Sequence, residues 1–178
     1  VPEFEYTDLA ELFENAEKNH TKPLIVLLDG VTDPHNLGAI VRSAAAFGAS
    51  GVVIPGRRSA SMNVTAWKAS AGAAARLPVA RVSNLVNAIR QCKEQGCFVL
   101  GLDGGGTSSV RESDLADRPL ALVTGAEGDG ISRLVKENCD LLTRIEISSE
   151  VESLNAAVAT GIALFEVAAV RREKAAEN

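Results

Sequence analysis

Short apolar runs alternate with helix-like segments along most of this chain, and that alternation limits the folds it can adopt. Each run is rich in Val, Ile or Leu and is bounded by Gly, Pro or Asp; the runs are 24–28, 51–54, 97–102, 120–124 and 141–147. Helices are predicted between them, over 36–47, 66–75, 85–95, 132–138 and 153–172. Continuous apolar strands separated by helices are typical of a parallel sheet buried on both faces. The sequence therefore predicts an α/β fold, with a mostly parallel sheet and helices on both faces.

The 178 residues correspond to the size of one domain. Residues 1–22 are acidic and polar, with a weak helical pattern around Leu9 and Leu12, and we interpret them as a linker or docking segment. The domain itself is expected over 23–178. Because the chain does not begin with methionine, we expect it to be a processed or truncated form of a longer protein.

Composition indicates a cytoplasmic protein. No apolar run reaches the ~20 residues of a membrane helix, and the acidic start lacks the basic region of a signal peptide. The three cysteines, Cys92, Cys97 and Cys139, contain no CxxC pair, which argues against a disulfide framework. A reducing compartment is therefore the simplest location.

Charge and aromatic content restrict how this chain could recognise a nucleic acid. The net charge of −5 weakens any expectation of broad nucleic-acid binding, although a local basic site remains compatible with it. Only 4% of the residues are aromatic, so stacking on an aromatic platform is not expected to be the main mode of recognition.

The first of three polar loops follows the run 24–28. A strand is expected to end at Asp29 and a helix to begin near Asn36, which suits the N-cap position. Gly38 lies one turn before Arg42, so it could leave room for a ligand beside the guanidinium. The alternative is an ordinary capped helix whose Arg42 pairs with a surface carboxylate.

The second polar loop follows the run 120–124 and contains three glycines, Gly125, Gly128 and Gly130. Glycines after a strand allow a ligand to approach the backbone closely. Glu127 and Asp129 would repel a pyrophosphate, so a cationic or neutral ligand suits this loop better. The alternative is a tight strand-to-helix turn without a ligand.

The third polar loop precedes the last predicted helix, where Ser153 is expected to be the N-cap and Asn155 adds a donor and an acceptor. Simple capping is the alternative. Along this helix we expect one buried stripe, formed by Leu154, Ala157, Val158, Gly161, Phe165 and Ala168. All three loops follow strands of one presumed sheet, and ligands bind at the carboxyl ends of such strands.

Three segments in this order resemble the motifs of the SpoU-type RNA ribose 2′-O-methyltransferases of the SPOUT superfamily. They are 36–39 with Arg42, 122–128 and 153–159. The resemblance covers about residues 23–172 and is nearest to the branch that methylates a guanosine ribose of 23S ribosomal RNA. A tRNA ribose methyltransferase is the alternative within the family.

The resemblance implies a deep trefoil knot in the C-terminal part of the fold, which the periodicity could not have indicated because knots are rare. It also implies S-adenosylmethionine as cofactor and a homodimer with the active site between subunits. The implied cofactor-binding residues are Gly125, Ile145 and Leu154, with Thr124 and Gly101 nearby. Members of the family commonly carry a small N-terminal RNA-binding domain, for which residues 1–22 leave no room.

The resemblance also assigns catalytic roles, to Arg42, Asn36, Glu127, Ser153 and Asn155. Because a guanidinium is a poor base, we expect Arg42 to act mainly as an electrostatic clamp on the 2′-oxygen and the adjacent phosphate. Asn36 would orient the ribose or Arg42, Glu127 would hold its loop, and Ser153 and Asn155 would position the nucleotide.

Four basic residues around the second strand could guide RNA, namely Arg57, Arg58, Lys68 and Arg76; the alternative is a solvated face. We expect no metal site, since His20 and His35 have no ligand-like partners in the sequence. Two other functions stay open. One is a SPOUT-like module that binds RNA or cofactor without catalysis, and the other is a Rossmann-type nucleotide enzyme, which the missing early GxGxxG motif disfavours.

Overall fold

The structure, a computed structural model, describes residues 3–126 and 128–178 and contains a six-stranded sheet whose pairings are all parallel. Its strands are β1 (Leu24–Asp29), β2 (Gly51–Pro55), β3 (Val79–Val82), β4 (Phe98–Leu102), β5 (Leu120–Gly125) and β6 (Leu141–Thr143). They lie in the order β3-β2-β1-β5-β4-β6, so β1 is central and β5 returns to lie beside it. The predicted parallel α/β fold is confirmed.

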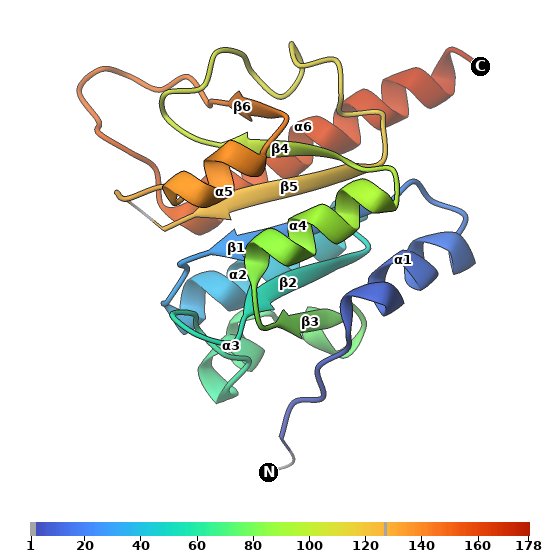
Figure 1. Cartoon of the computed structure of the whole chain (residues 1–178), viewed down its shortest axis with the longest axis vertical. Coiled ribbons are helices and arrows are strands. Elements are labelled where there is room, and N and C mark those ends of the chain that lie inside the picture. Colours follow the sequence, from blue (N-terminus) through green and yellow to red (C-terminus); the bar gives the residue numbers. More distant parts are fainter. Residues whose placement is uncertain (1–2, 127) are drawn as a thin grey trace.

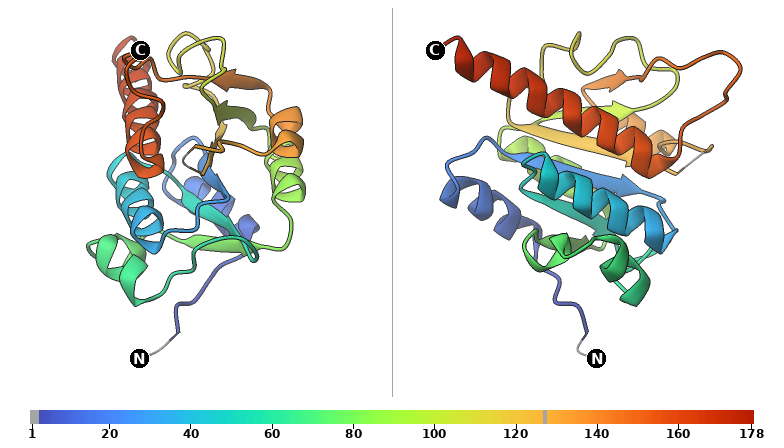
Figure 2. Two further views of the ribbon diagram at one scale, coloured as in Figure 1. Left: turned by 90° about the vertical axis from the view of Figure 1, so that its left-hand side faces the viewer. Right: turned by 180° about the vertical axis from the view of Figure 1, so that it is seen from behind.

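Helices cover both faces of the sheet, as predicted. They are α1 (Leu9–Lys18), α2 (Pro34–Ala46), α3 (Val64–Ala69), α4 (Leu85–Glu94), α5 (Arg133–Asn138) and α6 (Ala156–Ala176), with a short 3-10 turn at Ala73–Ala75. Figure 1 has α1, α4 and α5 in front of the sheet, and the view from behind in Figure 2 has α2, α3 and α6 on the other face. Among the described residues, no helix is long and apolar enough to cross a membrane.

The core is divided by the sheet into two layers because successive side chains of a strand point to opposite faces. Leu24, Val26 and Leu28 of β1 pack in one layer with residues of α2 and α6. Ile25 and Leu27 pack in the other layer, with residues of α1, α4 and α5. Both layers are apolar, which explains why β1 reads as a continuous hydrophobic run.

Helix α1 belongs to the second layer. Its Leu12 is fully buried, and the side-chain amide of Asn15 donates a hydrogen bond of 3.0 Å to the carbonyl of Ser50. Asp8 caps the helix by accepting from the backbone N–H of Glu11. Residues 8–18 are therefore packed against the sheet, in agreement with a docking helix more than with a free linker.

Three predicted elements differ from the structure. β3 was missed, because only four residues form it and Arg81 lies within them. The helix predicted over 66–75 is interrupted after Ala69, where Ala71 and Gly72 adopt positive φ angles of 51° and 88°. The last strand ends at Thr143, so the rest of the predicted run 141–147 lies in a loop.

Both predicted N-caps were wrong by two or three residues. Asp33 caps α2, accepting from the N–H of His35, so Asn36 lies inside the first turn. Asn155 caps α6, accepting from the N–H groups of Ala157 and Val158, so Ser153 lies in the preceding loop. Asp and Asn compete equally well for these positions, which is why the sequence alone misplaces the boundary.

The buried face of α6 also differs from the predicted stripe. Thr160, Leu164 and Val167 are fully buried, whereas Val158 and Phe165 are each 51% exposed. Because α6 is apolar on several faces, the periodicity could not identify which of them meets the sheet.

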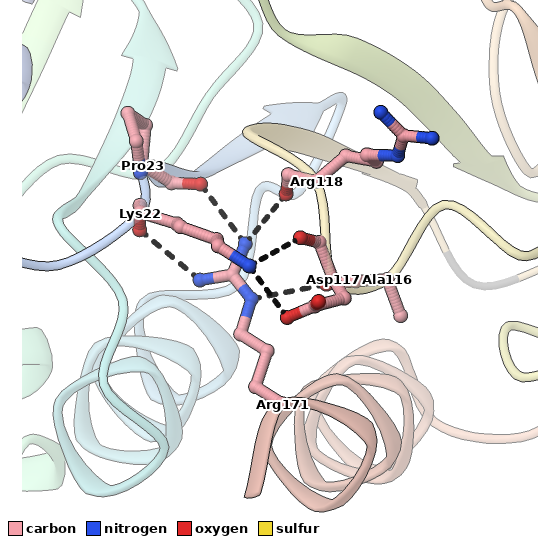
Figure 3. A network of polar contacts seen from close by, with 6 residues as sticks. All are labelled: Lys22, Pro23, Ala116, Asp117, Arg118 and Arg171. Carbon is pink, nitrogen blue, oxygen red and sulfur yellow. Dashed lines mark hydrogen bonds and ion pairs between the residues drawn. The ribbon is translucent and has the colours of Figure 1, made fainter. Parts of the chain in front are cut away.

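Arg171 of α6 joins three distant parts of the chain (Figure 3). Its guanidinium donates to the carbonyls of Ala116, Lys22, Pro23 and Arg118, at 2.8–3.1 Å. These carbonyls flank the starts of β1 and β5. Burial lowers the pKa of Arg171, an effect that the nearby Asp117 opposes. Arg171 therefore fastens the last helix to the amino edge of the sheet through four backbone carbonyls, of which that of Pro23 also accepts from the N–H of Leu120.

Replacing Arg171 by Met should destabilise the protein by about 3 kcal/mol, because charge-assisted hydrogen bonds are lost and partly buried carbonyls are left unsatisfied. The measurement is urea unfolding followed by circular dichroism. The matched control is Arg172→Met on the exposed side of the same helix, which should change stability by less than about 0.5 kcal/mol. Equal effects of the two substitutions would contradict the role given to Arg171.

Candidate functional site

A cleft of about 370 Å³ lies at the carboxyl ends of β4, β5 and β6. In Figure 1 these ends point to the left, where the loops after the three strands gather. The lining comes from the loop after β4, the glycine-rich loop after β5, and the segment 143–154 that joins β6 to α6. Its volume is in the range of small-molecule sites, and its position is the one that parallel α/β sheets use for ligands.

The glycine-rich loop after β5 is closed tightly on itself. Gly130 donates a backbone hydrogen bond of 2.8 Å to the carbonyl of Ala126. A Cβ atom on Gly125 would lie 2.2 Å from the backbone of Gly130, so no other residue fits at 125 without moving the loop. Gly130 itself has a φ of +66°. The glycines of this segment thus serve to fold the loop back over the end of β5.

The segment that leads into α6 is fixed from both sides. Asn155 caps the helix with its carbonyl oxygen, and its amide donates a hydrogen bond of 3.0 Å to Oδ1 of Asn36 in the first turn of α2. One turn further along, the hydroxyls of Thr160 and Thr124 are hydrogen bonded at 3.1 Å, and both residues are buried. The first and third sequence motifs therefore meet at the N-terminus of α6.

Acidic groups predominate around the cleft. Asp103, Asp129 and Glu152 line it together with one basic residue, Arg144. Asp103 is the most enclosed of them: it accepts a hydrogen bond from the N–H of Gly105 and forms an ion pair of 3.2 Å with Lys136. The cleft therefore suits a ligand that carries positive charge.

Most of the predicted cofactor residues line this cleft, namely Thr124, Gly125, Ile145 and Leu154. Gly101 lies within β4 instead, outside the described lining. A Cβ atom there would come within 2.9 Å of Cys139, Ile131 and Leu142, so Gly101 allows close packing beneath the cleft.

The predicted catalytic residues are only partly brought together. Ser153 lines the cleft, and Asn36 and Asn155 contact each other at its edge. Arg42 is exposed on α2, six residues after Asn36, which is about 9 Å along the helix axis. Glu127 lies outside the residues that the structure describes.

The space beside Gly38 is not available to a ligand, contrary to the sequence interpretation. A Cβ atom on Gly38 would lie 2.3 Å from the carbonyl oxygen of Ala66 and 2.5 Å from the Cβ of Ala69. Gly38 therefore lets α3 pack directly against α2. The close contact between the two helices explains the glycine at this position, but it does not account for the exposure of Arg42 one turn later.

The four predicted RNA-binding residues, Arg57, Arg58, Lys68 and Arg76, are all exposed. Arg57 and Arg58 lie in the loop after β2, and Lys68 and Arg76 border a second hollow described below. In the part of the chain that the structure covers, no group of three or more His, Cys, Asp or Glu side chains is placed to hold a metal ion.

Sequence reasoning missed Asp103 and Thr160. Asp103 directly follows a buried strand and precedes three glycines, which is the signal that the other polar loops also carry. Thr160 gave no such signal. Its hydroxyl donates to the carbonyl of Ala156 in its own helix at 2.7 Å, as threonines inside helices commonly do, and only the fold places Thr124 beside it.

Comparison with known proteins connects this site to a family. The model of the SpoU rRNA methylase family matches residues 23–165. An uncharacterized tRNA/rRNA methyltransferase of Mycolicibacterium vanbaalenii is 50% identical over 172 residues, which are 97% of this chain and 54% of that protein. The chain thus spans about half the length of the curated relatives it matches.

Solved structures agree in fold. The SpoU methyltransferase AviRb from Streptomyces viridochromogenes has a TM-score of 0.80 at 30% identity, covering 86% of this chain and 61% of that one. An AdoMet-bound rRNA methyltransferase from Sinorhizobium meliloti has a TM-score of 0.79 at 31% identity, covering 95% and 61%. The order of the three motifs, the cleft they form and the family match over most of the chain lead to one conclusion: the chain belongs to the SpoU rRNA methylase family.

Proposed function

We propose that this protein transfers a methyl group from S-adenosylmethionine to a ribose 2′-hydroxyl of RNA. A guanosine of 23S ribosomal RNA is the first candidate substrate, and a tRNA ribose is the second. The observation that carries the proposal is the cleft itself, which unites Gly125, Ile145 and Leu154 at the carboxyl edge of the sheet in a chain of the SpoU family. A cytoplasmic location follows from such a substrate.

The residues of the cleft fit this cofactor. Asp103, Asp129 and Glu152 provide negative charge for a cation, and Ile145, Val151 and Leu154 provide apolar contacts for a flat ring. Gly125 at the end of β5 lines the cleft without a side chain, so a ligand could approach its backbone closely. When bound, the cofactor supplies a methyl group on a positively charged sulfur.

The protein must then hold the ribose oxygen in line with that methyl group and favour loss of the hydroxyl proton. The 2′-oxygen would bond to the methyl carbon, the sulfur would keep the electron pair of the broken carbon–sulfur bond and become a neutral thioether, and the hydroxyl proton would pass to solvent water. We assign Arg42 to stabilise the developing negative charge and to hold the adjacent phosphate. Asn36 would orient the ribose, with Asn155 holding Asn36, while Ser153 and Glu127 would shape the pocket.

A homodimer would complete the site. Val158, Ile162 and Phe165 form an exposed apolar row on α6, 36–51% exposed at spacings of four and three residues. α2 packs beside α6, with Ser43 next to Gly161 and the ring of Phe47 against Phe165. A second copy covering the row would bury apolar surface and meet the helix that carries Arg42. We therefore propose that Arg42 acts in the cleft of the partner subunit.

The exposed basic residues would then contact the RNA. Arg57 and Arg58 lie after β2 on the carboxyl side of the sheet, and their charge is local on an otherwise acidic chain. Each true phosphate contact that is removed should reduce the steepness of the salt dependence of RNA binding by about 0.7–0.9.

We assign residues 23–178 to the catalytic domain, with 1–22 as a docking segment that follows an RNA-binding region of the longer protein. We also propose a C-terminal knot. Strand β6 is hydrogen bonded to β4 and also to the loop after β4: Thr107 donates to Leu142, and Arg144 donates to Ser108. If the chain is knotted, pulling on both of its ends would tighten the knot and the chain would stop short of its full length. An unknotted chain would extend fully, to about 3.3–3.6 Å per residue.

The rival is a module that binds cofactor or RNA without catalysis. Transfer of tritiated methyl groups from S-adenosylmethionine to unmodified 23S ribosomal RNA or tRNA separates the two. Cofactor binding without transfer to either RNA would favour the module, and the labelled RNA would identify the substrate class.

Replacing Gly125 by Ala should weaken S-adenosylmethionine binding at least about tenfold, because the added methyl group collides with the backbone of Gly130. Calorimetric titration measures this. Gly56→Ala is the matched control, since Gly56 follows β2 and an added Cβ would meet only the carbonyl oxygen of Val82, at 3.8 Å. Unchanged affinity in Gly125→Ala would remove the loop after β5 from the cofactor site.

Arg42→Ala should abolish methyl transfer while leaving cofactor affinity unchanged. Mixing it in equal amounts with Gly125→Ala should restore about one quarter of the wild-type activity, because half of the dimers then contain one intact composite site. If Arg42 acted within its own subunit, each mixed dimer would lack every complete site and the mixture would stay inactive.

A further inference from the structure

A second hollow, of about 1130 Å³, lies away from the cofactor cleft, between α3, the turn before β3 and the N-terminal segment. In Figure 1 α3 and β3 occupy the lower part of the molecule, near the start of the chain. Trp67 and Val64 of α3 border it and remain 43% and 55% exposed. Large apolar side chains left this open on a small domain indicate a contact surface.

Three of the seven aromatic residues of the chain meet here. Phe4 packs edge-on against Tyr6 and Trp67, with ring centroids 5.0 and 6.2 Å apart. The hydroxyl of Tyr6 accepts a hydrogen bond of 2.8 Å from the N–H of Met62, and the guanidinium of Arg81 lies 4.4 Å from the centre of the Tyr6 ring. The cluster is therefore held in place from several sides, and Trp67 presents a pre-ordered ring at its rim.

Cations surround this aromatic cluster. Lys68, Arg76 and Arg81 line the hollow, against Glu3 and Glu5 on the N-terminal segment. The local excess of positive charge contrasts with the net charge of −5 for the whole chain. An aromatic ring flanked by flexible cations matches single-stranded nucleic acid, whose bases stack while its phosphates seek positive charge. An apolar peptide would carry no negative charge to pair with the three cations.

The hollow is also connected to the proposed reaction. α3 packs directly on α2 through Gly38, and the turn at Ala73–Ala75 contacts α2 as well. α2 carries Arg42, so an RNA strand held at Arg42 would pass α3 on the same face of the molecule.

We propose that this hollow is a binding groove for an unpaired segment of the RNA substrate. One base stacks on Trp67, and Lys68 and Arg76 contact phosphates on either side. The inference rests on the proposed function for the nature of the substrate, and it assigns a contact outside the cofactor cleft and the reacting nucleotide.

Trp67 is the single tryptophan of the chain, so its fluorescence reports on this groove alone. The experiment titrates the protein with an oligoadenylate of about 12 nucleotides, long enough for one groove. Binding is followed in two ways, by tryptophan emission and by the anisotropy of a dye on the oligonucleotide. We expect the emission to be quenched in parallel with the rise in anisotropy.

Four variants sharpen the test. Trp67→Ala should weaken binding about 5- to 100-fold, which is the loss of one stacked base, whereas Trp67→Phe should stay within about threefold of wild type. Lys68→Ala with Arg76→Ala should lower the slope of binding against salt by about 1.4. Lys18→Ala with Arg90→Ala removes the same charge from exposed sites on α1 and α4 and should leave the slope unchanged.

The proposal is contradicted if binding raises the anisotropy without quenching Trp67. It is also contradicted if the salt slope is reduced equally in both double variants. Absence of any oligonucleotide binding would overturn it too. Quenching by an apolar peptide in place of RNA would identify a protein-docking surface and contradict the proposal. Methyl transfer is assayed separately, so loss of transfer with preserved quenching would reject the proposed reaction and leave the groove standing.

Discussion

The site depends on how the beginning of α6 is held against two early elements. Asn155 both caps α6 and donates to Asn36 of α2, and Thr160 joins Thr124 at the end of β5 in the buried interior. These contacts connect residues 119 and 36 positions apart in the chain. Because separating a buried hydroxyl pair costs free energy, this contact helps to hold the start of α6 against β5. Arg171 secures the same helix about three turns after Thr160, so α6 is fixed at both of these places.

Acidic and basic side chains occupy separate parts of this fold. Asp103, Asp129 and Glu152 surround the cleft at the ends of β4 to β6, where a cation is favoured. Lys68, Arg76 and Arg81 border the hollow beyond α3, where an anion is favoured. The two sets lie on opposite sides of the central strand β1, since the sheet order puts β2 and β3 on one side and β4 to β6 on the other. The net charge of the whole chain indicates neither the acidic cleft nor the basic hollow.

The sequence predicts the strands that are buried on both faces, because each of them is a continuous apolar run that can be identified from its own residues. It fails where tertiary contacts decide. Gly38 looked like space for a ligand, yet α3 fills that space, and α3 itself was obscured by Gly72, which breaks the predicted longer helix. Thr124, Gly125, Ile145 and Leu154, which the family motifs indicated as candidates, all line the cleft, whereas the contact of Thr160 with the distant Thr124 could not be read from the sequence.

Helix α6 explains why one subunit leaves the proposed site incomplete. A helix with a single apolar face can bury that face against one sheet. Helix α6 buries Leu164 and Val167 in this way, and it also exposes apolar side chains, namely Val158, Ile162 and Phe165. Exposed apolar residues at helical spacing add nothing to a monomer and favour association. The same layer contains α2, whose exposed Arg42 lies outside its own described cleft. In the twofold arrangement proposed above, a second copy would cover the row and bring a guanidinium toward its partner's cleft, so the same contact would serve both packing and chemistry.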